Sequence, residues 1–287
     1  MLDRSMKKSK SINEEKEERL RPVFLISGAQ KSGTTAMFEY LAKHHLIVTS
    51  SIKEIDFFGC IARYNKGIGF YHSHFPLAEN NPGKITFDAS PNYLFASQAP
   101  KRIYDYNPNI KQIVLLREPV ERAFSAWNMY RKLYKVDKGW FHNWMRRCDE
   151  SYDKGQLVRR NIEKFDSFDY VIAEELSAQE KGKDIEASLL AHGLYSKQLE
   201  RYFCIFKKEQ ILILEKDTFK VDTIRTLKQV EKFLGLSEHN WSNEDLASVF
   251  KGEYENDVPA KTKELLKAYY RPHNERLYKL INVFYNW

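Results

Sequence analysis

Cysteine is scarce in this sequence, and long apolar runs are missing from it. The 287 residues include three cysteines, Cys60, Cys148 and Cys204, which lie far apart and form no C-x-x-C pair. This argues against a disulfide scaffold and against a zinc site. No stretch approaches the roughly 20 apolar residues that span a bilayer, and residues 1–20 hold no apolar segment of signal-peptide length. We therefore expect a cytoplasmic protein without a transmembrane segment.

The composition is that of a globular protein. Low-complexity runs and internal repeats are absent, 43% of the residues are hydrophobic and 30% are charged, and the length suits one large α/β domain. We predict a charged N-terminal arm over residues 1–20 and a single domain over residues 21–287. The net charge of +7 suits anionic partners such as nucleotides, acidic glycans or nucleic acid, without choosing among them.

Residues 23–35, V-F-L-I-S-G-A-Q-K-S-G-T-T, form the most informative stretch. The β-branched and aromatic run at 23–26 predicts a strand that is covered on both faces of a parallel sheet. Gly28 and Gly33 bracket a tight turn, and Thr34 and Thr35 are placed to cap a following helix. Such a helix points free N–H groups and the positive end of its dipole at the turn. The stretch therefore predicts an anion site.

The order of residues within the turn indicates which anion it binds. A loop for ATP or GTP reads G-x-x-x-x-G-K-[ST], with its lysine after the second glycine. Here Thr34 follows Gly33, and the lysine lies inside the loop as Lys31. A cation there can meet the bridging oxygen of a short phosphate ester, and no residue is evident that would hold a metal. The alternative is an ordinary glycine turn with a solvated lysine.

K-S-G-T-T after a hydrophobic strand resembles the 5′-phosphosulfate loop of sulfotransferases. These enzymes use 3′-phosphoadenosine 5′-phosphosulfate (PAPS), release 3′-phosphoadenosine 5′-phosphate (PAP) and need no metal. The resemblance implies that Lys31 is catalytic. It also implies that the donor is bound by the loop residues Gln30, Lys31, Ser32, Gly33, Thr34 and Thr35.

The stretch S-I-K-E-I-D-F-F at 51–58 contains a candidate general base, Glu54. The apolar residues that follow it could desolvate the carboxylate and raise its pKa, whereas Lys53 would lower that pKa. From the residues alone, Glu54 could also be an ordinary exposed glutamate. Residues 51–76 resemble the heparan sulfate N- and 3-O-sulfotransferase branch, in which the glutamate before the F-F pair is the catalytic base. That role falls on Glu54.

A second anion site follows the buried strand predicted at 111–116, K-Q-I-V-L-L. Arg117 ends this strand, Pro119 suits the first turn of a helix, and Ser125 lies two turns further on. The arginine and the serine can converge on one oxyanion. Alternatively, Arg117 pairs with Glu121 and Ser125 only packs. The eight-residue spacing resembles the 3′-phosphate site of PAPS enzymes.

Two further segments differ from the glycan-acting relatives. A predicted strand at 84–87 is followed by D-A-S-P-N-Y, where Ala89 takes the place of a lysine that those relatives commonly have. In the same turn, Asp88 and Ser90 either serve the site or simply form the turn. Lys251 and Gly252 match the start of a K-G-R loop that binds the donor, and Glu253 replaces its arginine.

The rest of the chain predicts a scaffold and an insertion. We expect helices at 99–106, 193–206 and 223–234, and a strand at 210–214. From about 133 to 186 strand signals stop, which predicts a helical acceptor-side insertion over the active site. Its aromatic and basic residues either contact the acceptor or pack the insertion; they include Trp140, Trp144, Arg146, Arg147, Arg159 and Arg160.

Together these features predict a P-loop-type three-layer α/β/α fold with a short parallel sheet. The resemblance implies a PAPS-dependent sulfotransferase that acts on a hydroxyl or amine, with a sugar or polysaccharide as acceptor and neither a metal nor a nucleic acid as partner. Two alternatives stay open. One is a P-loop kinase or NTPase that uses Mg-ATP, and the other is a non-catalytic polyanion-binding protein.

Overall fold

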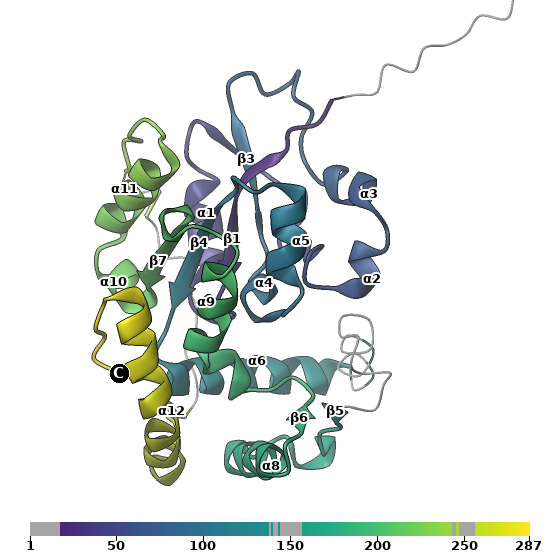
Figure 1. The fold of residues 1–287 in the computed structure, drawn as a ribbon, viewed down its shortest axis with the longest axis vertical. Helices are drawn as coiled ribbons and strands as arrows, with labels where there is room; N and C mark the ends of the chain where they lie inside the picture. The colour runs from purple at the N-terminus through teal and green to yellow at the C-terminus, as the bar shows by residue number, and fades with distance from the viewer. Residues whose placement is uncertain (1–17, 138, 140–142, 144–156, 243–244, 247–255) are drawn as a thin grey trace, which may run out of the picture.

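A five-stranded, fully parallel sheet forms the centre of the protein (Figure 1). The computed structural model describes residues 18–137, 139, 143, 157–242, 245–246 and 256–287. Across the sheet the strands run in the order β2 (Ile47–Thr49), β3 (Ile85–Ala89), β1 (Pro22–Gly28), β4 (Lys111–Leu116) and β7 (Ile211–Glu215). Because all five strands are parallel, the loops that follow them meet along one edge of the sheet.

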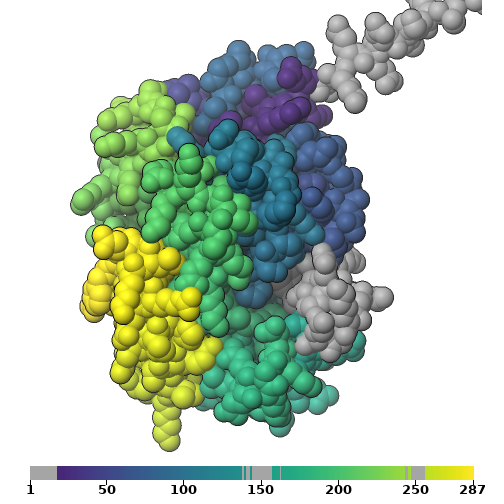
Figure 2. All heavy atoms as spheres, viewed as in Figure 1, coloured from purple at the N-terminus to yellow at the C-terminus, as the bar shows by residue number. Residues whose placement is uncertain are grey.

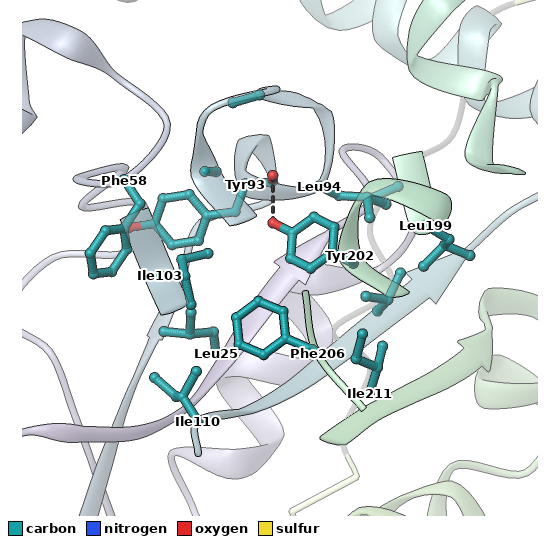
Figure 3. Close-up of a cluster of buried hydrophobic side chains, with 14 of the residues drawn as sticks. Leu25, Phe58, Tyr93, Leu94, Ile103, Ile110, Leu199, Tyr202, Phe206 and Ile211 are labelled. Atoms are coloured by element: carbon teal, nitrogen blue, oxygen red, sulfur yellow. Dashed lines mark hydrogen bonds between the residues drawn. The ribbon is translucent and has the colours of Figure 1, made fainter. Parts of the chain in front are cut away.

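Helices cover both faces of this sheet, since successive side chains of a strand point to opposite faces. Leu25 and Val114 pack in one apolar cluster with helices on one face (Figure 3), and Phe24 and Ile113 pack in another on the opposite face. The flanking helices are α4 (Asn92–Phe95), α5 (Ala99–Tyr106) and α9 (Tyr195–Phe203) on the first face, and α1 (Thr34–Leu41), α10 (Lys216–Val221) and α11 (Thr223–Leu234) on the second. The predicted three-layer architecture is confirmed.

One polar contact crosses the first apolar cluster. The hydroxyl of Tyr202 on α9 donates to the backbone oxygen of Tyr93 on α4 over 2.7 Å, the bond drawn in Figure 3. Both side chains are fully buried. A buried hydroxyl is costly without a partner, so this bond fixes how α9 lies against α4.

A layer of helices lies beyond the carboxyl edge of the sheet (Figure 1). It contains α6 (Pro119–Val136), α8 (Phe168–Glu180) and α12 (Ala260–Ile281), which share a third apolar cluster. The C-terminal helix α12 also packs along α9, as the adjoining yellow and green surfaces of Figure 2 show. No helix within the described ranges is both long and apolar enough to cross a membrane.

The predicted insertion contains a feature that the sequence pattern did not indicate. Two strands, β5 (Leu157–Val158) and β6 (Asp184–Ile185), pair in parallel within it. The expectation that strands stop between 133 and 186 was therefore wrong, because two-residue strands are too short to show a period. The remaining short elements are α2 (Ile61–Tyr64), α3 (Ile68–His72), η1 (Ile162–Lys164), η2 (Ala191–Gly193) and η3 (Lys208–Gln210).

The end of the predicted N-terminal arm is attached to the domain. Arg19 forms an antiparallel bridge with Leu77, and the Leu20 N–H donates to the Pro76 oxygen over 2.9 Å. Residues 1–17 lie outside the described part of the chain. Val23, predicted to be covered, is 44% exposed, because the chain enters the sheet from its surface at this point.

Candidate active site

The three predicted motifs meet at the carboxyl edge of the sheet: the Glu54 segment follows β2 and reaches the end of β3, and β3, β1 and β4 are neighbours. The Glu54 N–H donates to the oxygen of Ala89, the last residue of β3, over 3.1 Å. Residues 28–35 follow β1, and the Ala29 N–H donates to β4 at the oxygen of Leu115 over 2.7 Å. Arg117 follows β4 and donates to the oxygen of Lys31 over 3.4 Å. The loop therefore lies between the glutamate and the arginine.

The loop itself ends in a helix N-terminus, as predicted, but its cap differs. Gly33 is the N-cap residue of α1, with a φ of 93°, and no side-chain hydrogen bond caps the helix. Thr34 and Thr35 are the first two helical residues, so the prediction that they act as caps was wrong. Because a first-turn N–H has no partner within its helix, these groups are directed at the loop and favour an anion.

Ser32 provides a direct test of whether the loop suits an anionic ligand. Its side chain is fully buried, and its hydroxyl has no hydrogen-bond partner within the described residues. The neighbouring phenol of Tyr195 donates instead to the oxygen of Arg117 over 2.9 Å. A buried hydroxyl without a partner is costly, so an acceptor oxygen brought by a ligand would satisfy it. The loop residues therefore fit a phosphate ester.

Tyr195 and Tyr130 support the loop from behind, and the sequence analysis missed both. Burial raises the pKa of Tyr195 to about 12, so its phenol stays a neutral donor. Tyr130 on α6 donates to Oε1 of Gln30 over 3.1 Å, which orients that loop side chain. Aromatic residues in such positions resemble ordinary core residues in the sequence, and no local signal distinguishes them.

Arg117 is placed for a second anion next to the loop. Its side chain is 11% exposed, and Nη2 lies 3.5 Å from Oε2 of Glu121, at the outer limit of a hydrogen bond. The alternative pairing with Glu121 is thus present but long. Ser125, two turns into α6, is 2% exposed. Glu118 caps α6 by accepting from the Glu121 N–H over 2.6 Å, which holds the start of this helix behind Arg117.

Glu54 lies in an exposed environment, one of the two alternatives that the sequence left open. Its side chain is 56% exposed and accepts from Nζ of Lys53 over 2.8 Å. The apolar neighbours Ile55 and Phe57 point into the core instead of covering the carboxylate. Of the two alternatives that the sequence left open, the exposed glutamate is the one observed, because the left-handed backbone at Glu54, with a φ of 66°, separates its side chain from the residues that follow.

Several residues predicted to contact the acceptor or the donor lie outside the described part of the chain. Trp140, Trp144, Arg146 and Arg147 lie outside the described residues, as do Lys251, Gly252 and Glu253. Arg160 is 3% exposed and binds Oε2 of Glu175 over 2.6 Å, so it anchors α8 and does not face an acceptor. Arg159 is exposed. Where the chain is described, no group of three or more His, Cys, Asp or Glu side chains is arranged to hold a metal ion.

A parallel sheet with a glycine loop and a helix N-terminus at its carboxyl edge defines a P-loop-type α/β protein. Residues 21–268 match the family described as the sulfotransferase domain. The chain therefore belongs to the sulfotransferase domain family.

The chain is also similar to several named proteins. It is 28% identical over 91% of its length to the mouse bifunctional heparan sulfate N-deacetylase/N-sulfotransferase 4, of which it spans 30%. It is also 28% identical over 93% of its length to the human heparan sulfate glucosamine 3-O-sulfotransferase 5, of which it spans 74%. A crystallised sulfotransferase from Alicyclobacillus acidocaldarius has the same fold, with a TM-score of 0.66 and 25% identity over 92% of this chain and 97% of that one.

Proposed function

We propose that this protein transfers a sulfonate group from PAPS to a hydroxyl or amine of a carbohydrate. The observation that carries the proposal is the meeting of three groups at one edge of the sheet: Glu54 follows β2 and binds the end of β3 through its N–H, the anion loop follows β1, and Arg117 follows β4. PAPS has an activated sulfonate next to one phosphate and a second phosphate on its ribose. A site with two adjacent anion positions and a base beside one of them suits this donor.

The donor-binding roles follow from the contacts. Ser32, the first-turn N–H groups of α1 and the Gln30 side chain would hold the 5′ end. The Arg117 guanidinium and the Ser125 hydroxyl would hold the 3′-phosphate. Arg117 also binds the Lys31 backbone, so the two positions are linked by a direct contact. The Arg117 guanidinium would favour an anion at the 3′ position, next to the loop that would hold the 5′ end.

The chemistry needs a proton acceptor and a counter-charge. The bound donor supplies a sulfonate whose bond to the bridging oxygen breaks as the acceptor oxygen or nitrogen bonds to sulfur. Glu54 takes the proton that the acceptor loses, and its exposed carboxylate is open to an incoming sugar. Lys31 stabilises the negative charge that develops on the bridging oxygen. Nζ of Lys53 donates to Oε1 of Glu54 over 2.8 Å and so orients the carboxylate.

The names of two relatives and the net positive charge of the protein support a carbohydrate acceptor. One relative is named for an N-sulfotransferase activity and the other for a glucosamine 3-O-sulfotransferase activity, both on heparan sulfate. An amine and a hydroxyl of the same sugar are therefore the acceptor groups to test first. The net charge of +7 favours an acidic glycan over a neutral one.

The test measures transfer of radiolabelled sulfonate from PAPS to a panel of acceptors. The panel contains an unsulfated glucuronic acid and N-acetylglucosamine polymer, the same polymer with its amines freed, and a neutral glucan. We expect transfer to one of the first two. Glu54→Gln should reduce turnover at least about a hundredfold with nearly unchanged PAP affinity, as loss of a general base does. Glu39→Gln, at an exposed glutamate of α1, is the matched control.

Equal turnover of Glu54→Gln and wild type would contradict the base assignment. Calorimetry with PAP and with Mg-ATP separates the remaining possibilities. Metal-independent binding of PAP is expected. Binding of Mg-ATP without PAP would instead favour the kinase alternative, and binding of neither would favour a non-catalytic polyanion-binding protein.

A further inference from the structure

A buried carboxylate lies directly behind the turn that carries Glu54. Asp88, near the end of β3, is 0% exposed. Its Oδ1 accepts from the Ser90 hydroxyl over 2.7 Å, and its Oδ2 accepts from the Tyr93 hydroxyl over 2.5 Å. The Tyr71 hydroxyl reaches the same Oδ2 over 3.3 Å. Asp88 thus binds hydroxyl groups and has no cation among its described hydrogen-bond partners.

Two of these hydroxyls also bind the backbone of the Glu54 turn. The Asp56 N–H donates to Oγ of Ser90 over 2.8 Å, and the Phe57 N–H donates to the hydroxyl oxygen of Tyr93 over 3.0 Å. Each hydroxyl therefore gives its proton to Asp88 and offers its lone pair to the turn. Because a carboxylate only accepts, Asp88 fixes the direction of both hydroxyl protons at once. The Tyr71 hydroxyl has no such bond to the turn among the described contacts.

This turn needs such support because its backbone is unfavourable. Glu54 and Asp56 have φ values of 66° and 48°, in the left-handed region that residues with a side chain rarely adopt. The Glu54 N–H is bound by the Ala89 oxygen, and Arg63 binds the backbone oxygens of Glu54 and Ile55. With the bonds from Ser90 and Tyr93, the turn is held on both sides. The exposed Glu54 carboxylate consequently starts from a fixed Cα position.

We infer that Asp88 is a positioning residue for Glu54, acting through the hydroxyls of Ser90 and Tyr93. This inference rests on the proposed role of Glu54 as general base. A general base must lie within hydrogen-bond reach of the proton it takes, and a displacement of about 1 Å can cost about a hundredfold in rate. Asp88 would therefore affect the rate of transfer without touching donor or acceptor.

The buried charge of Asp88 opposes folding, although its bonds from three hydroxyls offset part of that cost. Burial raises its pKa to about 6, although the hydroxyls of Tyr93, Ser90 and Tyr71 lower it and nearby Glu54 adds to the rise. Above that pH the buried charge opposes folding, because the unfolded chain releases the proton more readily. An uncharged residue of the same shape should be tolerated by the fold at pH 8.

The test compares Asp88→Asn and Tyr93→Phe with Tyr71→Phe as matched control. Asn keeps one acceptor oxygen and turns an NH₂ group to the other hydroxyl, which loses its acceptor. We expect both variants to lower kcat at least about tenfold, with PAP affinity and acceptor KM within about twofold of wild type. Tyr71→Phe loses a hydroxyl on the same carboxylate but no bond to the turn, and it should keep turnover within about twofold.

Two further readouts separate positioning from a structural role. At pH 8 the loss of the buried charge and the loss of one hydroxyl's acceptor act in opposite directions, so the Asp88→Asn protein should unfold close to the temperature of wild type, although it turns over more slowly. In a Glu54→Gln background, Asp88→Asn should add little further loss, because both changes remove the same base. Low turnover that follows a lower unfolding temperature, or additive losses, would overturn the inference.

The same experiment tests the positioning role of Asp88 separately from the proposed role of Glu54 as general base. If Glu54→Gln loses turnover while Asp88→Asn and Tyr93→Phe keep it, positioning by Asp88 is wrong and the base assignment stands. If Glu54→Gln keeps turnover, both are wrong.

Discussion

Arg117 donates a hydrogen bond from Nη1 to the backbone oxygen of Lys31 over 3.4 Å. The two residues are 86 positions apart in the chain, and each comes from a different predicted anion motif. Their contact follows from the pairing of β1 with β4, which places both loops at one edge of the sheet. The two proposed phosphate positions are therefore neighbours, and they can be tested as one site.

Arg117→Ala should weaken PAP binding about a hundredfold, since hydrogen bonds from a charged donor contribute about 1.5–3 kcal/mol each. Adenosine 5′-phosphate lacks the 3′-phosphate, and its weaker binding should hardly change in the variant. Calorimetry with both ligands on both proteins measures the difference. Arg225→Ala, at an exposed arginine of α11, is the control. A similar loss for both ligands would mean that Arg117 supports the loop and does not bind the 3′-phosphate.

Gly28→Ala should destabilise the fold through contact with α4. A Cβ at this position would lie 2.5 Å from Cβ of Leu94, too close for any real pair. We expect a loss of about 1–3 kcal/mol in the free energy of unfolding, as overpacked cores show. Gly69→Ala is the matched control: nothing lies within 4 Å of its added Cβ, and alanine favours the helix α3.

Urea unfolding of the single and double variants tests the cause. Leu94→Ala alone should cost about 2–5 kcal/mol, because the leucine is fully buried. Combined with Gly28→Ala it should cost less than the sum, since the clash is then relieved. Additive losses would show that the alanine strains the loop itself and not the contact with α4.

His192 should make the protein less stable in acid. Burial is the main cause that lowers its pKa from 6.5 to about 3, and Arg122 adds to the shift. Because the unfolded chain binds a proton below about 6.5 and the folded chain does not, stability is complete above that pH and falls as the pH drops towards 3. At pH 4.5 the loss from this group alone is about 3 kcal/mol.

His192→Phe removes this titration and is the variant to measure. It should be less stable at pH 7, because Nδ1 of His192 lies 2.8 Å from the Ser188 oxygen and that bond disappears. Its free energy of unfolding should change less between pH 7 and 4.5 than that of wild type. The acidic groups common to both proteins cancel in this comparison. If the free energy of unfolding falls equally in both proteins between pH 7 and 4.5, His192 does not contribute to acid unfolding.

Several elements could be predicted to the residue because their signals are local. The strand β4 contains the apolar run I-V-L-L, and α5 and α11 are bounded by Asn107 and Gly235. Gly235 has a φ of 77°, the left-handed conformation that ends helices. The resemblance to sulfotransferases also rested on short stretches of consecutive residues, and the family match confirms it.

The surroundings of the candidate site could not be predicted in the same way. The sequence left open whether the apolar residues beside Glu54 cover its carboxylate; the turn directs them into the core and leaves the carboxylate exposed. The buried partners of the site, Tyr130 and Tyr195, come from positions 100 and 78 residues away from Gln30 and Arg117. Such contacts depend on the order of strands and helices in space.

The sequence by itself determined which residue types follow each strand: a glycine loop with Lys31, an arginine at 117, and a carboxylate before two phenylalanines. Only the tertiary structure decided that β1 lies between β3 and β4, and that the Glu54 segment, which follows β2, crosses to the end of β3, so that these groups meet at one edge of the sheet. It also decided that Asp88 holds the Glu54 turn through two hydroxyls. The physical reason is that local patterns specify backbone conformation and burial, whereas hydrogen bonds between distant residues require the packed sheet.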